Sequence, residues 1–371
     1  MVKQQLSAFE LISLLIWAVM GTGVLTLPWA IGQFVVRDAW ISGLLIIVIQ
    51  IIVAMLVTWY VRVLPNQSLV EGLQTALGPW LGRLLAVWFL LWLYLLNAMI
   101  VREMTLFLEE TVLPRTPIYV LSGLFVLAAA YAVSQGIETM GRVAQLLTPF
   151  AFVITAALFV FALPQADFHQ IAPVLADGWL PVWRGAVLPW TWSVELVTVL
   201  QFVTTVKNAP KTLGKYVLLS GALMALLGVF AEIIITSVLG YQRTSAMFPV
   251  LEVVRTIHVG QFFERLDPLY VMGATVLIAI KTSVFQYAMV TGIQQVFKLQ
   301  SGKSVIWSGA LAVWAGSIFL WRESADLGNY MIFTVPTYYL STMLLLPLCA
   351  SGVQTVRRKW FPASVASEKK A

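Results

Sequence analysis

The chain has 371 residues, of which 60% are hydrophobic and only 11% are charged, and its formal net charge is +6. Soluble domains carry about 45–50% apolar and about 25% charged residues, so this balance excludes an ordinary soluble domain and, more firmly still, a disordered chain. One cysteine, Cys349, and two histidines, His169 and His258, exclude a disulfide scaffold and a zinc-ligand cluster. The composition predicts an all-α polytopic membrane protein with no metal site and no cofactor. We interpret the excess of basic residues as a sign of orientation in the lipid bilayer, and we predict no nucleic-acid partner.

Ten segments are candidates for membrane-spanning helices, each of which needs roughly 20 mostly apolar residues. The fourth and the ninth are short. In chain order they are Phe9–Ile31, Ala39–Val63, Leu84–Phe107, Ile118–Val133, Val143–Ala162, Ala186–Val206, Tyr216–Leu239, Leu269–Val296, Val305–Trp321 and Leu327–Ala350. They predict one transmembrane domain over residues 1–371, with five-helix halves at 1–163 and 186–350 and a cytoplasmic tail at 351–371.

The distribution of Lys and Arg predicts the orientation. Ten spans place both termini on the same side of the membrane. Fourteen Lys and Arg fall on that side and seven on the other, while Arg102 and Lys281 lie inside spans, which accounts for all 23. Because cytoplasmic loops carry an excess of Lys and Arg, both termini are predicted to be cytoplasmic.

The first span is interrupted in the run Gly21-Thr22-Gly23-Val24-Leu25-Thr26-Leu27-Pro28. Irregular backbone at membrane depth is tolerated only where it is buried in protein or lines a cavity. The free N–H groups of a second half-helix would present a positive dipole end to an anionic group, such as a carboxylate. The alternative is a notch of small residues that packs against a neighbouring helix.

The sixth span, which opens the second half, is interrupted in the run Pro189-Trp190-Thr191-Trp192-Ser193-Val194-Glu195-Leu196. Paired breaks in corresponding positions are typical of an inverted-repeat transporter, with the binding site between them. Trp190 and Trp192 flank that predicted cavity, although tryptophans in membrane proteins are more often interface anchors or packing residues.

Charged side chains inside the spans are costly and usually face a cavity or a partner. Glu195, beside the sixth-span break, is predicted to bind an ammonium group or to carry a proton; the alternative is a structural carboxylate bonded to a neighbouring helix. Lys281 lies near the centre of the eighth span and is predicted to stand in for a coupling cation or to carry a proton; the alternative is snorkelling to an interface. Arg102 and Glu103 adjoin in the third span and cannot face each other, so each needs another partner or an aqueous lining.

These residues resemble a known family. The run 21–28 resembles the first helix of the amino acid–polyamine–organocation superfamily. Four further motifs resemble the spore germination B-subunit family (GerAB-type) more specifically, and all five occur in register along nearly the whole chain. The four are Arg37-Asp38-Ala39-Trp40-Ile41-Ser42, Leu113-Pro114-Arg115-Thr116-Pro117, Gly136-Ile137-Glu138-Thr139-Met140-Gly141-Arg142 and Phe263-Glu264-Arg265-Leu266-Asp267.

The resemblance implies a LeuT-like fold of ten helices, a 5+5 inverted repeat with helices 1 and 6 broken. It implies a subunit of a nutrient germinant receptor in the inner membrane of a bacterial spore, with receptor A and C subunits as partners. A small germinant, an amino acid, would bind between the first and sixth helices. Carried over to this chain, the binding residues are Gly21, Thr22, Gly23, Val24, Trp192, Ser193 and Glu195.

Two functions are compatible with these features. In the first, a sensor binds a germinant and passes a shift of the helix bundle to partner subunits. In the second, a proton-coupled amino acid permease of the same fold moves its substrate inward, with Lys281 or Glu195 as the titrating group. An enzyme is disfavoured, because no nucleophile–base pair, metal cluster or phosphate loop stands out, and no catalytic residue is predicted.

Overall fold

The computed structural model describes residues 4–257 and 266–360. His258, residues 263–265 of the fifth motif and residues 361–371 of the predicted tail lie outside the described residues. Within the described part, seven helical segments are long and apolar enough to cross a membrane, and three shorter apolar helices add to them. These segments follow the order of the ten predicted spans, so the prediction of an all-helical, multi-pass membrane protein is confirmed.

The first half begins with a broken helix, α1 (Ala8–Gly23) and α2 (Leu27–Gly32). Ser7 and Glu10 form a capping box at the start of α1, which satisfies two backbone N–H groups and fixes the point where the helix begins. The remaining helices are α3 (Ala39–Leu44), α4 (Ile46–Val63), α5 (Leu69–Leu77), α6 (Pro79–Thr111), α7 (Ile118–Ser134) and α8 (Ile137–Ala162), followed by the short 3-10 turns η1 (Leu163–Gln165) and η2 (Phe168–Ile171).

The second half also begins with an interrupted helix, because α9 (Trp179–Ser193) continues as the 3-10 helix η3 (Val194–Thr205). It continues with α10 (Ala209–Leu239), the 3-10 turn η4 (Gly240–Thr244), α11 (Pro249–Arg255), α12 (Asp267–Phe297), α13 (Lys303–Phe319), α14 (Ser324–Asn329), the π-helical turn η5 (Tyr330–Thr334) and α15 (Val335–Trp360).

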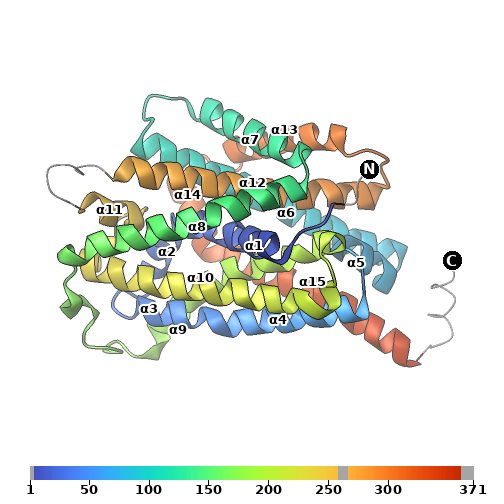
Figure 1. Cartoon of the computed structure of the whole chain (residues 1–371), viewed down its shortest axis with the longest axis horizontal. Coiled ribbons are helices and arrows are strands. Elements are labelled where there is room, and N and C mark those ends of the chain that lie inside the picture. The colour runs from blue at the N-terminus through green and yellow to red at the C-terminus, as the bar shows by residue number, and fades with distance from the viewer. Residues whose placement is uncertain (1–3, 258–265, 361–371) are drawn as a thin grey trace.

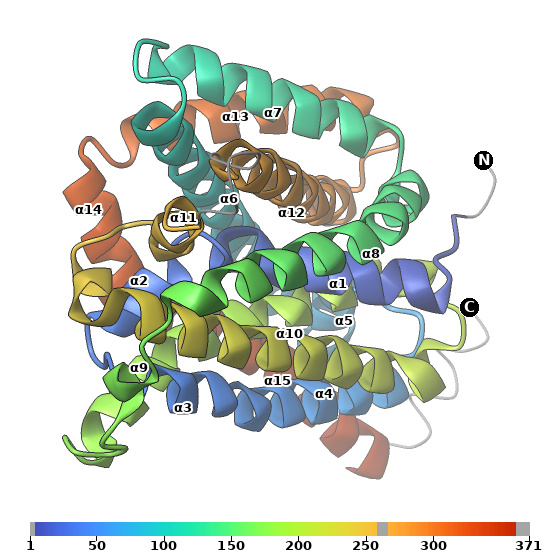
Figure 2. The ribbon, with the colours of Figure 1, turned by 60° about the vertical axis from the view of Figure 1, so that its left-hand side comes forward.

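The long helices run roughly along the long axis of the molecule (Figure 1). Seen after a turn of the molecule, α7 and α13 form one edge, α3 and α4 the opposite edge, and α1 lies between them (Figure 2). Helix α1 packs against α8, α10 and α12, and most of its side chains are buried. The broken helix is therefore the centre of the bundle.

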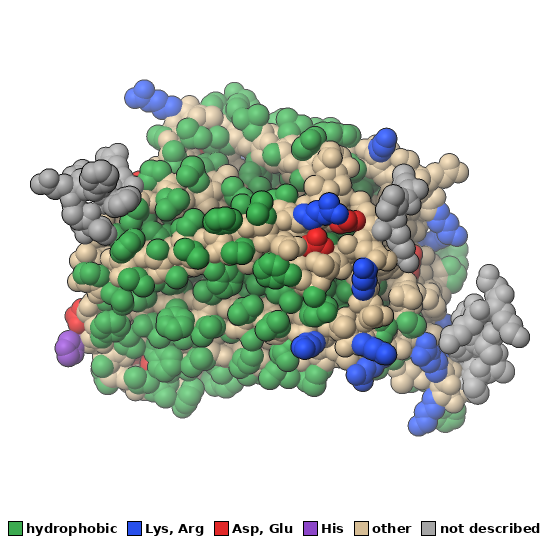
Figure 3. Space-filling model, viewed as in Figure 1, with side chains coloured by type: hydrophobic (Ala, Val, Ile, Leu, Met, Phe, Trp, Pro, Cys, Tyr) green, Lys and Arg blue, Asp and Glu red, His purple; other side chains and the backbone are tan. Residues whose placement is uncertain are grey.

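The surface matches a chain that spans a bilayer. In the view of Figure 3, hydrophobic side chains cover the flank of the molecule, and Lys and Arg gather at one end. The start of α1 and the end of α15 lie at that same end (Figure 1).

Several helices extend beyond the predicted spans, among them α9 at its start and α15 at its end. The sixth helix begins at Trp179, inside the predicted connection and directly after Gly178; Pro181 lies in the first helical turn, where proline is tolerated. The last helix runs on to Trp360 through part of the predicted tail. Its final turn carries Arg357, Arg358 and Lys359, and cations there are favourable toward the negative end of the helix dipole.

Candidate functional site

The two interrupted helices meet at the centre of the bundle. Helix α1 ends at Gly23, three residues follow, and α2 begins at Leu27 with Pro28 in its first turn. The linking residues stay close to the end of α1, since the N–H groups of Leu25 and Thr26 both donate to Thr22 O, at 3.0 and 3.3 Å. Opposite, the chain changes from α-helix to 3-10 helix between Ser193 and Val194, and α1 contacts both α9 and η3 there.

A buried ion pair connects this region to α12. Lys281 Nζ lies 2.7 Å from Glu195 Oε2 and donates to Thr22 Oγ1 at 2.8 Å, with Val19 O at 3.5 Å. The side chains of Lys281 and Glu195 are 0% and 1% exposed. The two in-span charges singled out in the sequence are therefore each other's partners, and the ammonium held by Glu195 here belongs to the chain itself.

The two tryptophans of the sixth span point in different directions. Trp192 is buried and donates from Nε1 to Thr22 Oγ1 at 2.9 Å, so it belongs to the same polar cluster as Lys281. Trp190 donates instead to Leu45 O, between α3 and α4, at 2.8 Å, and stacks edge-on with Trp183. The structure therefore brings Trp192 to the break and leaves Trp190 outside it.

Glycine at position 21 allows Lys281 to lie against α1. A Cβ at Gly21 would come within 2.7 Å of Lys281 Cδ and 2.8 Å of its Cβ, whereas a Cβ at Gly23 would have Leu27 Cδ2 as its nearest neighbour, at 3.9 Å. We expect Gly21→Ala to displace Lys281 and to cost about 1–3 kcal/mol, the usual range for overpacking. Gly23→Ala should be neutral or stabilising by up to about 1 kcal/mol, because alanine is the better helix former.

Thermal unfolding of the two purified variants in detergent measures this difference, and each variant serves as the control for the other. Equal melting temperatures for Gly21→Ala and Gly23→Ala would show that the contact between Gly21 and Lys281 does not constrain the fold.

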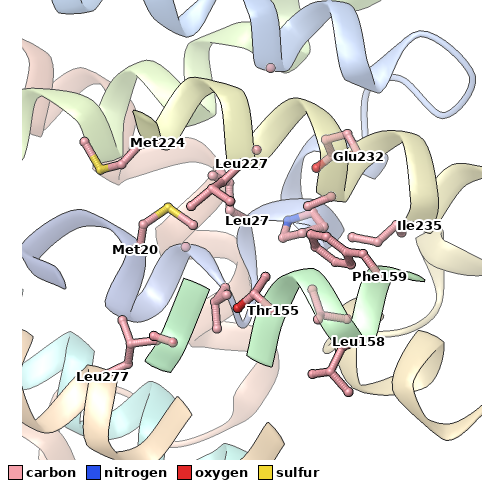
Figure 4. A pocket seen from close by; sticks show the side chains of 18 of the residues that line it. Met20, Leu27, Thr155, Leu158, Phe159, Met224, Leu227, Glu232, Ile235 and Leu277 are labelled. Carbon is pink, nitrogen blue, oxygen red and sulfur yellow. The ribbon is translucent and has the colours of Figure 1, made fainter. Parts of the chain in front are cut away.

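An apolar cavity of about 120 Å³ lies beside the break. Gly23, Val24 and Ser193 of the predicted binding residues line it. The other walls come from α3, α4, α8, α10, α11 and α12. In Figure 4, Met20, Met224 and Leu227 lie on one side of the view, and Leu158, Phe159 and Ile235 lie on the other. The predicted site thus divides into a buried polar cluster, made of Thr22, Trp192, Glu195 and Lys281, and this adjoining cavity.

A second buried ion pair stands at the wall of the cavity. Arg243 of η4 pairs with Glu232, which lines the cavity, and it also donates to Pro28 O and, at 2.9 Å, to Thr236 Oγ1. Arg243 is completely buried. It thereby ties α2 to α10. Sequence reasoning missed Arg243 because it lies in a predicted connection; the signal was Glu232, an in-span carboxylate that needed a cation.

The described residues contain no group of three or more His, Cys, Asp or Glu side chains that could hold a metal ion. Lys281 is instead paired with Glu195, and Arg243 with Glu232. The arrangement is suited to binding a small molecule reversibly next to a helix break.

The sequence matches a family model described as "Spore germination protein" over residues 5–321. Among curated proteins, it is 28% identical to "Spore germination protein KB" of Bacillus subtilis (strain 168) over 376 residues, which cover all of both chains. It is 29% identical to "Spore germination protein YndE" of the same organism over 287 residues, or 75% of this chain and 77% of the relative.

Two solved structures share the architecture. MhsT, solved in complex with L-phenylalanine, superposes with a TM-score of 0.67 at 15% identity, covering 97% of this chain and 90% of MhsT. Mhp1, a nucleobase-cation-symport-1 family transporter, superposes with a TM-score of 0.56 at 13% identity, covering 97% of this chain and 94% of Mhp1. At these identities the likeness shows the fold alone, and it confirms the LeuT-like arrangement with interrupted first and sixth helices.

Proposed function

The chain belongs to the spore germination protein family, and from that membership we propose that it is a membrane subunit of a nutrient germinant receptor that binds a small germinant beside the broken first helix. The observation that carries the proposal is the cavity of about 120 Å³ at the α1–α2 break, within a transporter-type fold. A proton-coupled amino acid permease would have the same fold. The relatives named for spore germination favour the receptor.

An amino acid is the germinant class that we propose. An engineered protein cavity of about 150 Å³ holds one benzene molecule, so a space of this size suits one small ligand. Most of the wall is apolar, and Thr155, Ser193 and Glu232 add oxygen atoms able to accept hydrogen bonds from an ammonium group. Gly23, Val24 and Ser193 would contact the ligand directly. Gly21, Thr22, Trp192, Glu195 and Lys281 would form the support behind it, with Lys281 in the place of a coupling cation.

The proposed signal is a change in the position of α2. A ligand moves an equilibrium between two conformations only through its different affinity for them. Helix α2 contributes Leu27 and Pro28 to the cavity wall, and Arg243 ties it to α10. A ligand in the cavity would therefore contact α2 directly, and a change in the contacts of Arg243 would let α2 move relative to α10. The receptor A and C subunits would receive the change. No catalytic step is part of this function.

The location in this proposal follows from the family, and the orientation follows from the charge distribution. The chain would lie in the inner membrane of the spore with both termini cytoplasmic. Supporting this, the Lys and Arg residues are concentrated at the end of the molecule where α1 starts and α15 finishes (Figures 1 and 3). We also propose that the halves 1–163 and 186–350 are the two inverted repeats. The first helix of the second half, α9, begins seven residues earlier than predicted, at Trp179.

Ligand-dependent thermal stability of the purified protein tests the proposal. A ligand that binds only the native state stabilises it by about 2.7 kcal/mol at a concentration of 100 times its Kd. We expect one or a few compounds from a set of L-amino acids, nucleosides and sugars to raise the melting temperature. Transport assays with the same compound in liposomes would then separate the receptor from the permease.

A matched pair of leucine substitutions locates the site. Gly23→Leu fills the cavity, so it should weaken binding at least about tenfold, or about 1.4 kcal/mol. Gly273→Leu makes the same change on α12 at a position where a Cβ meets no atom within 4 Å, so it should leave binding unchanged. Normal binding by a folded Gly23→Leu protein would show that the ligand does not bind in this cavity.

A further inference from the structure

Glu103 of α6 is a buried carboxyl group that the proposed function does not use. Its side chain is 0% exposed, and Oε1 accepts a hydrogen bond from Thr26 Oγ1, in the break between α1 and α2. Its other oxygen, Oε2, has no hydrogen-bond partner among the described residues. None of the ion pairs within residues 4–257 and 266–360 includes Glu103. One oxygen of the carboxyl group therefore accepts from a neutral donor, and the other oxygen has no partner in the described part of the chain.

The charged groups near Glu103 do not neutralise it. Lys281 of α12 is already bound to Glu195 of η3, so these three side chains together have one negative charge too many if both acids are ionised. Tyr270 of α12 and Tyr339 of α15 are the neighbouring phenols; Tyr270 donates its hydroxyl to Val24 O.

Arg102, the adjacent residue on α6, reaches away from Glu103 and donates to Arg322 O at 3.1 Å. An isolated carboxylate in so buried a place is far less stable than a neutral acid.

We propose that Glu103 is a proton-binding site, and that the native protein holds one proton on its free oxygen. A metal cation would need several oxygen ligands, and Oε2 is the one free oxygen of this carboxyl group. The ammonium of a germinant would need adjoining space, and Glu103 is not among the residues that line the cavity. Glu195 is less suited to hold the proton, because Lys281 Nζ already lies 2.7 Å from it.

The proton controls the charge beside the helix break. With Glu103 neutral, Glu195 and Lys281 balance each other, and Thr26 is held by a hydrogen bond. Loss of the proton leaves a net negative charge next to the break and favours a conformation in which Glu103 reaches water. This inference does not depend on which germinant binds, or on whether one binds.

Infrared difference spectroscopy of the purified protein tests the proposal without a germinant. The wild-type protein at neutral pH should show the C=O stretching band of a neutral, buried carboxyl group. That band should be absent from Glu103→Gln and present in Glu232→Gln, which changes another buried acid and leaves the pair of Glu195 and Lys281 intact. Thr26→Val should move the band, because it removes the hydroxyl donor. Absence of the band from wild type, or its persistence in Glu103→Gln, would overturn the proposal.

The pH dependence of thermal stability gives a second readout, because it shows whether the native or the unfolded state binds more protons. The native state holds a proton that the unfolded chain releases to water at neutral pH, so stability is retained at lower pH and lost as pH rises. We expect Glu103→Gln to melt at or above the wild-type temperature with a weaker dependence on pH, and Glu195→Gln to melt several degrees lower because Lys281 loses its partner. A Glu103→Gln protein that melts as far below wild type as Glu195→Gln would show that the ionised carboxylate is required.

Discussion

Replacing Lys281 by methionine should reduce the free energy of unfolding by about 3–5 kcal/mol, the range measured when one partner of a buried ion pair is removed. The length and most of the volume of the side chain are kept, so the loss comes from the charge. Glu195 would be left at 1% exposure without a cation, and Thr22 would lose one of its two donors. The measurement is thermal or denaturant unfolding of the purified protein in detergent.

The double variant Lys281→Met with Glu195→Gln separates charge from packing. Removing both charges leaves no unpaired ion, so much of the stability should return. A double variant as unstable as Lys281→Met alone would mean that the aliphatic packing of Lys281 against Gly21, and not the ion pair, holds the break together.

Replacing Arg243 by methionine should have an effect of similar size, about 3–5 kcal/mol, because it leaves Glu232 buried and unpaired. It also removes the donor to Pro28 O and so releases α2 from α10. We therefore expect a weaker response to germinant as well as a lower melting temperature, measured by the same unfolding and ligand-shift experiments.

Arg255→Met is the matched control for Arg243→Met. Arg255 forms an ion pair with Glu252 at 2.8 Å, but both side chains are about 40% exposed, so the loss should be about 0–1 kcal/mol. Comparable losses in the two variants would contradict the view that burial makes the Arg243 pair critical.

The sequence located the interrupted helices because glycine and proline are rare enough in apolar helices to be visible. Gly21, Gly23 and Pro28 marked the first break, and Glu195 and Lys281 stood out as charges in apolar runs. Their pairing could not be read from the chain, since the two lie 86 positions apart and nothing local links them. The resemblance to a family supplied the topology that brings them together.

The cavity itself had no signal in the sequence. A membrane helix shows apolar residues to lipid, to its neighbours and to a cavity alike, so Leu158 or Met224 could not be assigned to any of these three. Arg243 was hidden for the opposite reason, because a basic residue in a connection is ordinary. Arg243 is buried because η4 packs against α2 in the folded chain.

Lys281 has a further consequence for the energy available to this protein. A free cation has a concentration on each side of a membrane, and its downhill flow can do work on the protein that binds it. A positive charge that is bonded to the chain has no such concentrations, so no alkali-ion gradient can act through the position that Lys281 Nζ occupies between Val19, Thr22 and Glu195. Whatever moves the bundle must therefore draw its energy from somewhere other than an alkali cation entering that place.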